Sequence, residues 1–194
     1  MDTRAAILQH AETLIRTRGY AAFSFADLAG HAGIRKASVH HHFATKEALI
    51  DVLLTEYLER FVAALEGVRQ DHVSAPDRLR AYSRFFLEGF EEGKLPLCGA
   101  LSAERSALPP AMQPRIHHFF QLHLDWLHGV LDDGMSDDSL RAGLDVPKTA
   151  LLLLSTLEGG SFVGWALSDK IPVLAAFEAA LSTITSTITK GEGL

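Results

Sequence analysis

The sequence has only one cysteine, Cys98, so no disulfide can form within the chain. A chain without disulfides fits a reducing compartment, and we therefore expect a cytoplasmic protein. The first residues, MDTRAAILQHAETLI, carry charges throughout, and we expect no secretory signal there. Hydrophobic residues make up 47% and charged residues 22% of the chain, which is typical of a folded globular protein rather than a disordered one.

The motifs of several enzyme classes are also missing. There is no Gly-rich phosphate-binding loop, no nucleophile elbow and no pair of carboxylates beside a plausible base. We therefore expect neither an enzyme nor a bound cofactor. Long apolar runs are scarce too: only residues 149–168, TALLLLSTLEGGSFVGWALS, have the length of a membrane span. Glu158 lies in the middle of that run, which favours a helix buried in a core or subunit interface over a membrane segment.

The charge is unevenly distributed along the chain. The formal net charge is -6. Residues 1–50 contain six Lys or Arg against four Asp or Glu, an excess of +2, and five histidines, so the remainder carries -8. A mildly basic, His-rich head on an acidic body is what a polyanion-binding head would look like, although an excess of two charges is small.

Apolar residues recur at helical spacing nearly everywhere, and alternation typical of strands is absent. We predict an all-α protein of about nine helices, with a helix-turn-helix domain over 1–46 and a second domain over 47–194. Gly19, Gly33 and Pro172 suit helix termini, and Ser24 with Asp27 has the form of a capping box. The predicted helices cover about 3–18, 24–32, 35–42, 45–68, 77–92, 100–108, 113–133, 147–168 and 172–189, with an exposed loop over 132–147.

The two short helices of the head predict a helix-turn-helix. In FADLAGHAGIRKASVHHHF, Leu28 and Ala29 face inward, Gly33 makes the turn, and Val39 and Phe43 anchor the second helix. The second helix then points its polar residues outward, where such a helix enters a major groove.

This head resembles the DNA-binding domain of the TetR family of one-component transcriptional regulators. The matching features are GY before the first short helix, DLAGHAGI for the usual IAxxAGV, KASVHHHF for KGTLYHYF and TKEAL for SKEAL. The resemblance is strong over about residues 3–55 and loose elsewhere. It implies a homodimer that binds a palindromic double-stranded operator and is released by a small-molecule effector. The residues that it would place at DNA are Ser24, Arg35, Lys36, Ala37, Ser38, His40, His41 and Lys46.

The three consecutive histidines raise the question of a metal site. Adjacent helical residues lie about 100° apart, so His40, His41 and His42 cannot converge on one ion, and we predict no metal. The resemblance instead implies that His40 grips phosphate, that His41 faces the groove and that His42 packs against the fold. The family usually has tyrosine at position 40. Because a protonated imidazole holds phosphate better, we expect operator affinity to weaken as pH rises from about 6 to 8.

The body is predicted to supply a dimer face and an effector pocket. The last two helices are the candidates for the dimer face, since their glycines permit close approach and their large apolar side chains supply area. The residues predicted there are Leu153, Leu157, Gly160, Gly164 and Trp165. Aromatic side chains of the middle helices, Cys98 and the lone acid of the apolar run are candidates for the pocket, which would include Phe86, Phe90, Cys98, Phe120, Glu158 and Phe162. Glu158 would meet a cationic or polar ligand group, or else satisfy a buried partner.

Two alternatives stay open. LPLCGALSAE resembles a stretch of some electrophile- or oxidant-sensing members of the TetR family, and a thiolate near a helix N-terminus is more reactive, so Cys98 could make this a redox-sensing repressor. A lone cysteine is more often a small buried residue. A dimeric interaction module without DNA binding is the other alternative, against which the retained Arg35, Lys36, Ser38 and Lys46 argue.

Overall fold

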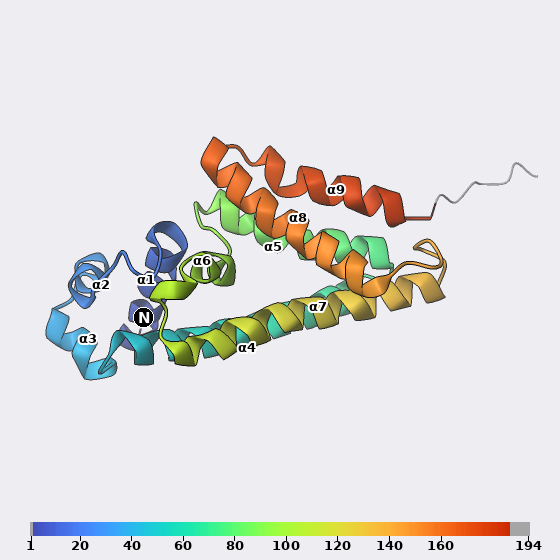
Figure 1. Ribbon diagram of the computed structural model, residues 1–194. Coiled ribbons are helices and arrows are strands. Elements are labelled where there is room, and N and C mark those ends of the chain that lie inside the picture. Colours follow the sequence, from blue (N-terminus) through green and yellow to red (C-terminus); the bar gives the residue numbers. More distant parts are fainter. Residues whose placement is uncertain (1, 187–194) are drawn as a thin grey trace, which may run out of the picture. The chain divides into compact units, whose positions relative to one another are not determined.

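The computed structural model describes residues 2–186, and that part of the chain contains nine α-helices and two short 3-10 helices (Figure 1). The predicted all-α class and number of helices are confirmed. The α-helices are α1 Thr3–Arg18, α2 Phe25–Ala32, α3 Lys36–His42, α4 Lys46–Asp71, α5 Ala75–Glu91, α6 Leu97–Ala103, α7 Gln113–Ser136, α8 Val146–Leu167 and α9 Ile171–Ile184. The 3-10 helices are η1 Arg105–Ala107 and η2 Pro110–Met112.

The chain forms two compact units. Unit 1 consists of Met1–Leu65 and Glu88–Leu122, and unit 2 of Glu66–Leu87 and His123–Leu194. Three long helices, α4, α5 and α7, therefore contribute one end to each unit. The predicted domain boundary between residues 46 and 47 was drawn between a DNA-binding function and a ligand-binding function. It does not coincide with the limits of the compact units, and it stays a prediction.

Three helix boundaries differ from the prediction. The helix predicted from Ala100 begins at Leu97 and continues into η1, because Pro96 precedes it and Leu97 and Leu101 are both buried. Helix α7 runs through Gly134 to Ser136, and Leu140 in the predicted exposed loop is buried. The last helix ends at Ile184, because Thr185 adopts an extended backbone and bridges Leu140. Ile188, predicted as helical, lies outside the described residues.

The core of unit 1 joins the N-terminal helices to α6 and the start of α7. Ile7, Leu14 and Ile15 of α1 pack with Leu97 and Leu101 of α6 in one buried cluster. Hydrogen bonds bind the same elements: the Arg16 guanidinium donates to the Leu95 carbonyl at 2.7 Å, and the Leu95 amide donates to the Arg16 carbonyl at 3.1 Å. This shared core holds α1, on which the helix-turn-helix rests.

The core of unit 2 is built from α8 and α9, which lie along each other, together with the facing ends of α5 and α7 (Figure 1). Gly160 allows α8 and α9 to pack closely, because a Cβ at this position would lie only 2.5 Å from the Pro172 carbonyl oxygen. Val173, Phe177 and Leu181 bury the inner face of α9. A side chain larger than glycine at position 160 would push α9 away.

Candidate DNA-binding and effector sites

The turn between α2 and α3 is fixed by local chemistry. Ser24 caps α2: its hydroxyl oxygen accepts from the amides of Ala26 and Asp27, and the Asp27 carboxylate accepts from the Ser24 amide at 2.7 Å. Gly33 follows α2 in the left-handed region at φ 65°, ψ 28°, which glycine adopts without strain. The predicted capping box and turn are confirmed. The Ser24 hydroxyl proton also goes to Asp27, at 2.7 Å, so contact between Ser24 and phosphate stays a prediction.

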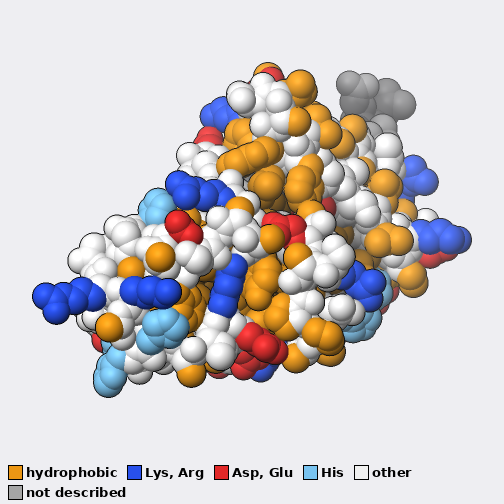
Figure 2. Space-filling view, turned by 60° about the vertical axis from the view of Figure 1, so that its left-hand side comes forward, with side chains coloured by type: hydrophobic (Ala, Val, Ile, Leu, Met, Phe, Trp, Pro, Cys, Tyr) orange, Lys and Arg blue, Asp and Glu red, His pale blue; other side chains and the backbone are white. Residues whose placement is uncertain are grey.

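Helix α3 is short and is held from one side. Val39 is fully buried and Phe43, at the end of the helix, is 4% exposed. Around these anchors, most of the side chains predicted to meet DNA point to solvent: Arg35, Lys36, Ala37, His40 and His41 are exposed and Ser38 is half-buried. Lys, Arg and His side chains gather at the end of unit 1 that carries α2 and α3 (Figure 2). The structure therefore brings five of the eight predicted DNA contacts onto α3 and a sixth, Arg35, to its N-cap.

Lys46 is oriented differently from the other predicted contacts. Its ammonium donates to the carbonyl oxygens of Tyr20 and Phe23 and lies 4.2 Å and 4.0 Å from the centres of their rings. Partial burial disfavours the charged form of the side chain and so lowers the pKa of Lys46. Lys46 ties the start of α4 to the segment between α1 and α2, so its role at phosphate stays a prediction.

The histidine run does not form a shared site. His40 meets the ring of Phe25 edge-on, with ring centres 5.0 Å apart, while the rings of His41 and His42 lie 5.4 Å apart. All three side chains are exposed, so the expectation that His42 packs against the fold is wrong. His42 is the last residue of α3, where a side chain can turn to solvent. Within residues 2–186, no cluster of three or more His, Cys, Asp or Glu could hold a metal ion.

Four of the five residues predicted for the dimer face lie on the inner side of α8. Leu153, Leu157, Gly160 and Gly164 are buried within unit 2, and Trp165 alone is exposed. Helical spacing identifies an apolar stripe but does not tell whether the same chain or a partner covers it, and here the stripe is buried within unit 2, where α8 packs along α9. The outer side carries other apolar residues, namely Leu151, Leu152, Phe162, Val163 and Leu167, and Gly159 with open space where a Cβ would be. Figure 2 shows hydrophobic side chains gathered over α8 and α9.

Helix α8 also meets the length and apolarity of a membrane span, with a hydropathy of 1.4 over its most apolar window. A single helix of this kind is weak support for a membrane protein. Its inner face packs along α9, and Glu158 stands at its middle, so we interpret it as the core helix of unit 2.

The residues predicted for an effector pocket belong to different units. Phe90, Cys98 and Phe120 lie in unit 1, and Phe86, Glu158 and Phe162 lie in unit 2, with Phe162 exposed. Cys98 is 1% exposed within the core of unit 1. Burial keeps solutes from the thiol, which is the opposite of the accessible thiolate that a redox sensor needs.

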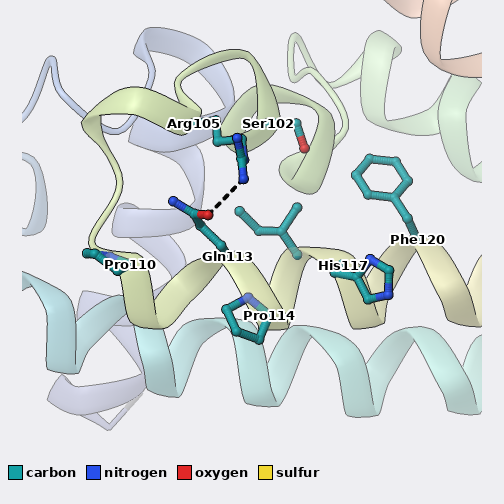
Figure 3. A pocket seen from close by; sticks show the side chains of 8 residues that line it. Ser102, Arg105, Pro110, Gln113, Pro114, His117 and Phe120 are labelled. Atoms are coloured by element: carbon teal, nitrogen blue, oxygen red, sulfur yellow. Dashed lines mark hydrogen bonds between the residues drawn. The ribbon is translucent and has the colours of Figure 1, made fainter.

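A pocket of 530 Å³ opens in unit 1 between η1, η2 and the start of α7 (Figure 3). Phe120 lines it, and so do Arg105 and Gln113, whose side chains are joined by a hydrogen bond of 2.9 Å. Of the six residues predicted for the effector pocket, only Phe120 borders this pocket. Its remaining lining residues are Ser102, Pro110, Pro114, Ile116 and His117.

A second candidate site is a buried polar cluster in unit 2. The hydroxyl of Tyr82 on α5 and Nδ1 of His123 on α7 are hydrogen-bonded at 2.5 Å, and the rings of Tyr82 and Trp126 stack with centres 5.2 Å apart. Burial lowers the pKa of His123 to about 3, so the ring is neutral at physiological pH. Both carboxylate oxygens of Glu158 are buried without a hydrogen-bond partner, and burial raises its pKa to about 7.

Sequence reasoning singled out Glu158, Phe86 and, among the aromatic side chains of the middle helices, Trp126, but it missed Tyr82 and His123 as parts of this cluster. His123 and Trp126 are three residues apart on α7, and such a pair shares one face of a helix. That spacing was the available signal. It did not distinguish a polar cluster from ordinary core, because Tyr82 comes from a helix about forty residues earlier.

Comparisons with known proteins agree on one family. Residues 7–53 match the family model described as bacterial regulatory proteins, tetR family. The chain is 29% identical over 147 residues, 74% of its length and 72% of the relative's, to the HTH-type transcriptional repressor KstR2 of Mycobacterium tuberculosis. It is 22% identical over 184 residues, 94% and 93% of the two lengths, to the fatty acid metabolism regulator protein of Bacillus subtilis.

Solved structures extend the match over the helical body. A TetR-family transcriptional regulator from Agrobacterium tumefaciens superposes with a TM-score of 0.90 at 28% identity, covering 95% of this chain and 98% of that one. A TetR transcriptional regulator from Legionella pneumophila superposes with a TM-score of 0.84, also at 28% identity and with the same coverage. Together with the capped and glycine-turned α2–α3 pair, these matches show that the chain belongs to the TetR family of DNA-binding transcriptional regulators.

Proposed function

We propose that this protein is a repressor that binds a palindromic operator as a homodimer and leaves it when a small-molecule effector binds the body. The observation that supports this most directly is the outer face of α3. Four predicted contacts on α3, together with Arg35 at its N-cap, are exposed around one buried anchor, Val39, so the helix can lie in a major groove without losing its packing. Membership in a family of regulators, rather than enzymes, agrees with the missing catalytic motifs.

The homodimer is proposed to form through the outer side of α8. Leu152, Gly159, Phe162 and Val163 recur at spacings of three, four and seven along this side, and all are exposed. Gly159, in place of the predicted Gly160 and Gly164, is then the glycine at which the partner's helix can approach closely. A second copy is the occupant that two-fold symmetric operator binding requires.

The release step is a population shift. An effector that binds better to a body conformation in which the two heads no longer match the half-site spacing moves the population away from the DNA-bound form. Half-sites on a duplex lie about one helical turn, or 34–36 Å, apart for this class of motif. Small changes in the body are therefore enough to weaken operator binding.

DNA binding is tested with duplexes selected from a random library, followed by titrations of the selected operator in increasing salt. Lys36→Ala should weaken binding to the selected operator by about 10- to 100-fold and reduce discrimination against random duplex, since a base contact carries about 1–3 kcal/mol. Lys148→Ala, on a well-exposed lysine of α8, is the control and should change neither. Failure to select any duplex, with no dependence on salt, would favour the interaction module that lacks DNA binding.

The dimer is tested by sedimentation equilibrium. Val163→Glu should convert the protein to a monomer, because it would bury a carboxylate against an apolar surface of the partner. Val73→Glu is the matched control at a highly exposed valine outside this surface and should leave the dimer intact. A native protein that sediments as a monomer would overturn the proposed interface.

A further inference from the structure

The buried cluster of unit 2 indicates the chemical class of the effector. We propose that Glu158, together with the aromatic side chains of Tyr82, Phe86 and Trp126, binds an organic ammonium ion. The proposal rests on the proposed function only in naming this ion as the effector. Binding of the ion can be measured without DNA.

The first observation is the state of the carboxylate. Both oxygens of Glu158 are buried, and neither accepts a hydrogen bond from any described residue. An ionised carboxylate removed from water costs several kcal/mol unless a counter-charge or donors are supplied. A ligand that brings a positive charge and N–H donors supplies both at once.

The second observation is the aromatic surround. The ring of Tyr82 stacks on Trp126 and lies edge-on to Phe86, with ring centres 5.2 Å and 5.7 Å apart. The pKa of Tyr82 is raised well above its ordinary value, first by burial and then by the charge of Glu158, which couples the carboxylate electrostatically to this ring. Aromatic faces attract cations and exclude water, which strengthens an ion pair formed beside them.

The third observation is that no cation among the described residues forms a salt bridge with the Glu158 carboxylate. The charge of Glu158 acts on Tyr82 of α5, and the hydroxyl of Tyr82 is hydrogen-bonded to His123 of α7, whose pKa of about 3 leaves it neutral. The face of α9 that packs on α8 is apolar: Val173, Phe177 and Leu181.

Arg69 of α4 lies 5.9 Å from the Trp126 ring, but Asp133 engages its guanidinium at 3.7 Å. No salt bridge to Glu158 occurs among the described residues. The Trp126 indole N–H is also buried without an acceptor and can donate to an oxygen of the same ligand. The site therefore matches a cationic ligand and repels an anionic one.

The binding should depend on pH in a defined direction. Burial raises the pKa of Glu158 to about 7, so about half of the protein carries the carboxyl in its protonated form near neutral pH. A cation binds the ionised form and lowers this pKa. Affinity should therefore rise between pH 6 and pH 8, and binding at pH 7 should release protons.

The test is isothermal titration of the full-length protein with benzylammonium chloride, benzyl alcohol and sodium benzoate, three probes that share one ring. We expect benzylammonium to bind at least tenfold more tightly than benzyl alcohol at pH 8, with proton release at pH 7, and benzoate not to bind. Equal binding of the ammonium and the alcohol, or no binding of the ammonium, would overturn the proposal.

Two variants assign the effect to the residue. Glu158→Gln keeps the shape of the side chain and should abolish both the preference for the ammonium and its pH dependence. Glu178→Gln, on an exposed acid of α9 in the same unit, should change neither. If Glu158→Gln does not fold, the pH dependence and proton release of the native protein still decide the matter, since a pH-independent affinity contradicts a titrating carboxylate.

A DNA-binding measurement separates this proposal from the proposed function. Benzylammonium should release the native protein from its selected operator, and Glu158→Gln should bind that operator normally without being released. A protein that binds benzylammonium but no duplex would contradict the repressor and leave the ammonium site intact. A protein that binds its operator but does not bind benzylammonium would contradict the ammonium site and leave the proposed repressor intact.

Discussion

His41 and His123 are the same residue type in opposite surroundings. His41 is exposed on α3, whereas His123 is 2% exposed on α7 and hydrogen-bonded to Tyr82. Burial lowers the pKa of His123 to about 3, so it behaves as a neutral polar member of the core. The number of adjacent histidines in the sequence therefore does not indicate whether a histidine is protonated. Burial of the individual ring decides whether it can take up a proton.

The largest expected effect concerns the two buried titratable groups. Burial raises the pKa of Glu158 from 4.5 to about 7, so this residue removes stability as pH rises through that range. The pKa of His123 is lowered from 6.5 to about 3, so this residue adds stability as pH rises from 3 to 6.5. The two slopes oppose each other between pH 4.5 and 6.5, where we expect the unfolding free energy of the native protein to be nearly flat.

Glu158→Gln removes one of these slopes. The difference in unfolding free energy between the variant and the native protein should then change by about 3 kcal/mol between pH 4.5 and 7.5, in favour of the variant at the higher pH. Urea titrations at several pH values measure this difference. A constant difference across the range would mean that Glu158 has the same pKa in the folded and unfolded protein, so that burial does not shift it.

The next effect compares the two lysines of the head. Lys46→Met should lower the unfolding free energy by about 1–3 kcal/mol, because it removes two hydrogen bonds to carbonyls and the contacts with the rings of Tyr20 and Phe23. Lys36→Met, at an exposed position, should leave stability within about 0.5 kcal/mol and act on operator binding instead. Chemical denaturation and operator titrations together check both; a Lys46→Met protein as stable as the native one would contradict the internal role.

A smaller effect is expected from the histidine run. Replacing His40, His41 and His42 by Gln should leave stability within about 0.5 kcal/mol, because all three side chains are exposed. Operator affinity of the native protein should fall between pH 6 and pH 8 while that of the variant stays level, if His40 meets phosphate. Parallel pH profiles of the two proteins would contradict that role.

The smallest effect is expected at Cys98. A buried thiol in the core of unit 1 should not react with a bulky aromatic disulfide reagent on the timescale of mixing, and should react at once in denaturant. Fast labelling of the native protein would revive the redox-sensing alternative. Cys98→Ala, which keeps the small apolar side chain, should still release its operator on adding the effector.

The head was largely predictable from local sequence. Ser24, Asp27 and Gly33 act within one or two turns of chain, and the structure confirms the cap and the left-handed turn that they indicated. The inward orientation of Val39 was predictable from the helical spacing of apolar residues, since a seven-residue helix on a surface has one inner side. The prediction that His42 packs against the fold was wrong, because helical periodicity does not determine the direction of the side chain of the last residue in a helix.

The body was less predictable because its faces are shared among elements distant in sequence. Leu153, Leu157, Gly160 and Gly164 were predicted at the dimer face, yet all four are buried within unit 2, in which α8 packs along α9. Leu140 was assigned to an exposed loop and is buried against Gly134. On α8 the apolar pattern identified a face that is buried, and tertiary packing decided which element buries it. For Leu140 no local pattern indicated burial, which only tertiary packing decided.

By itself the sequence determined the helices and the turn of the head, because caps, glycines and apolar spacing act over a few residues. The class of regulator followed from the resemblance of the head to the TetR family. Tertiary structure decided which side of α8 is exposed, that Lys46 points inward, and that the carboxylate of Glu158 is buried without a hydrogen-bond partner. These outcomes depend on which surfaces meet across helices far apart in the chain. The free energy of placing a charge among them depends on the surroundings and not on the residue alone.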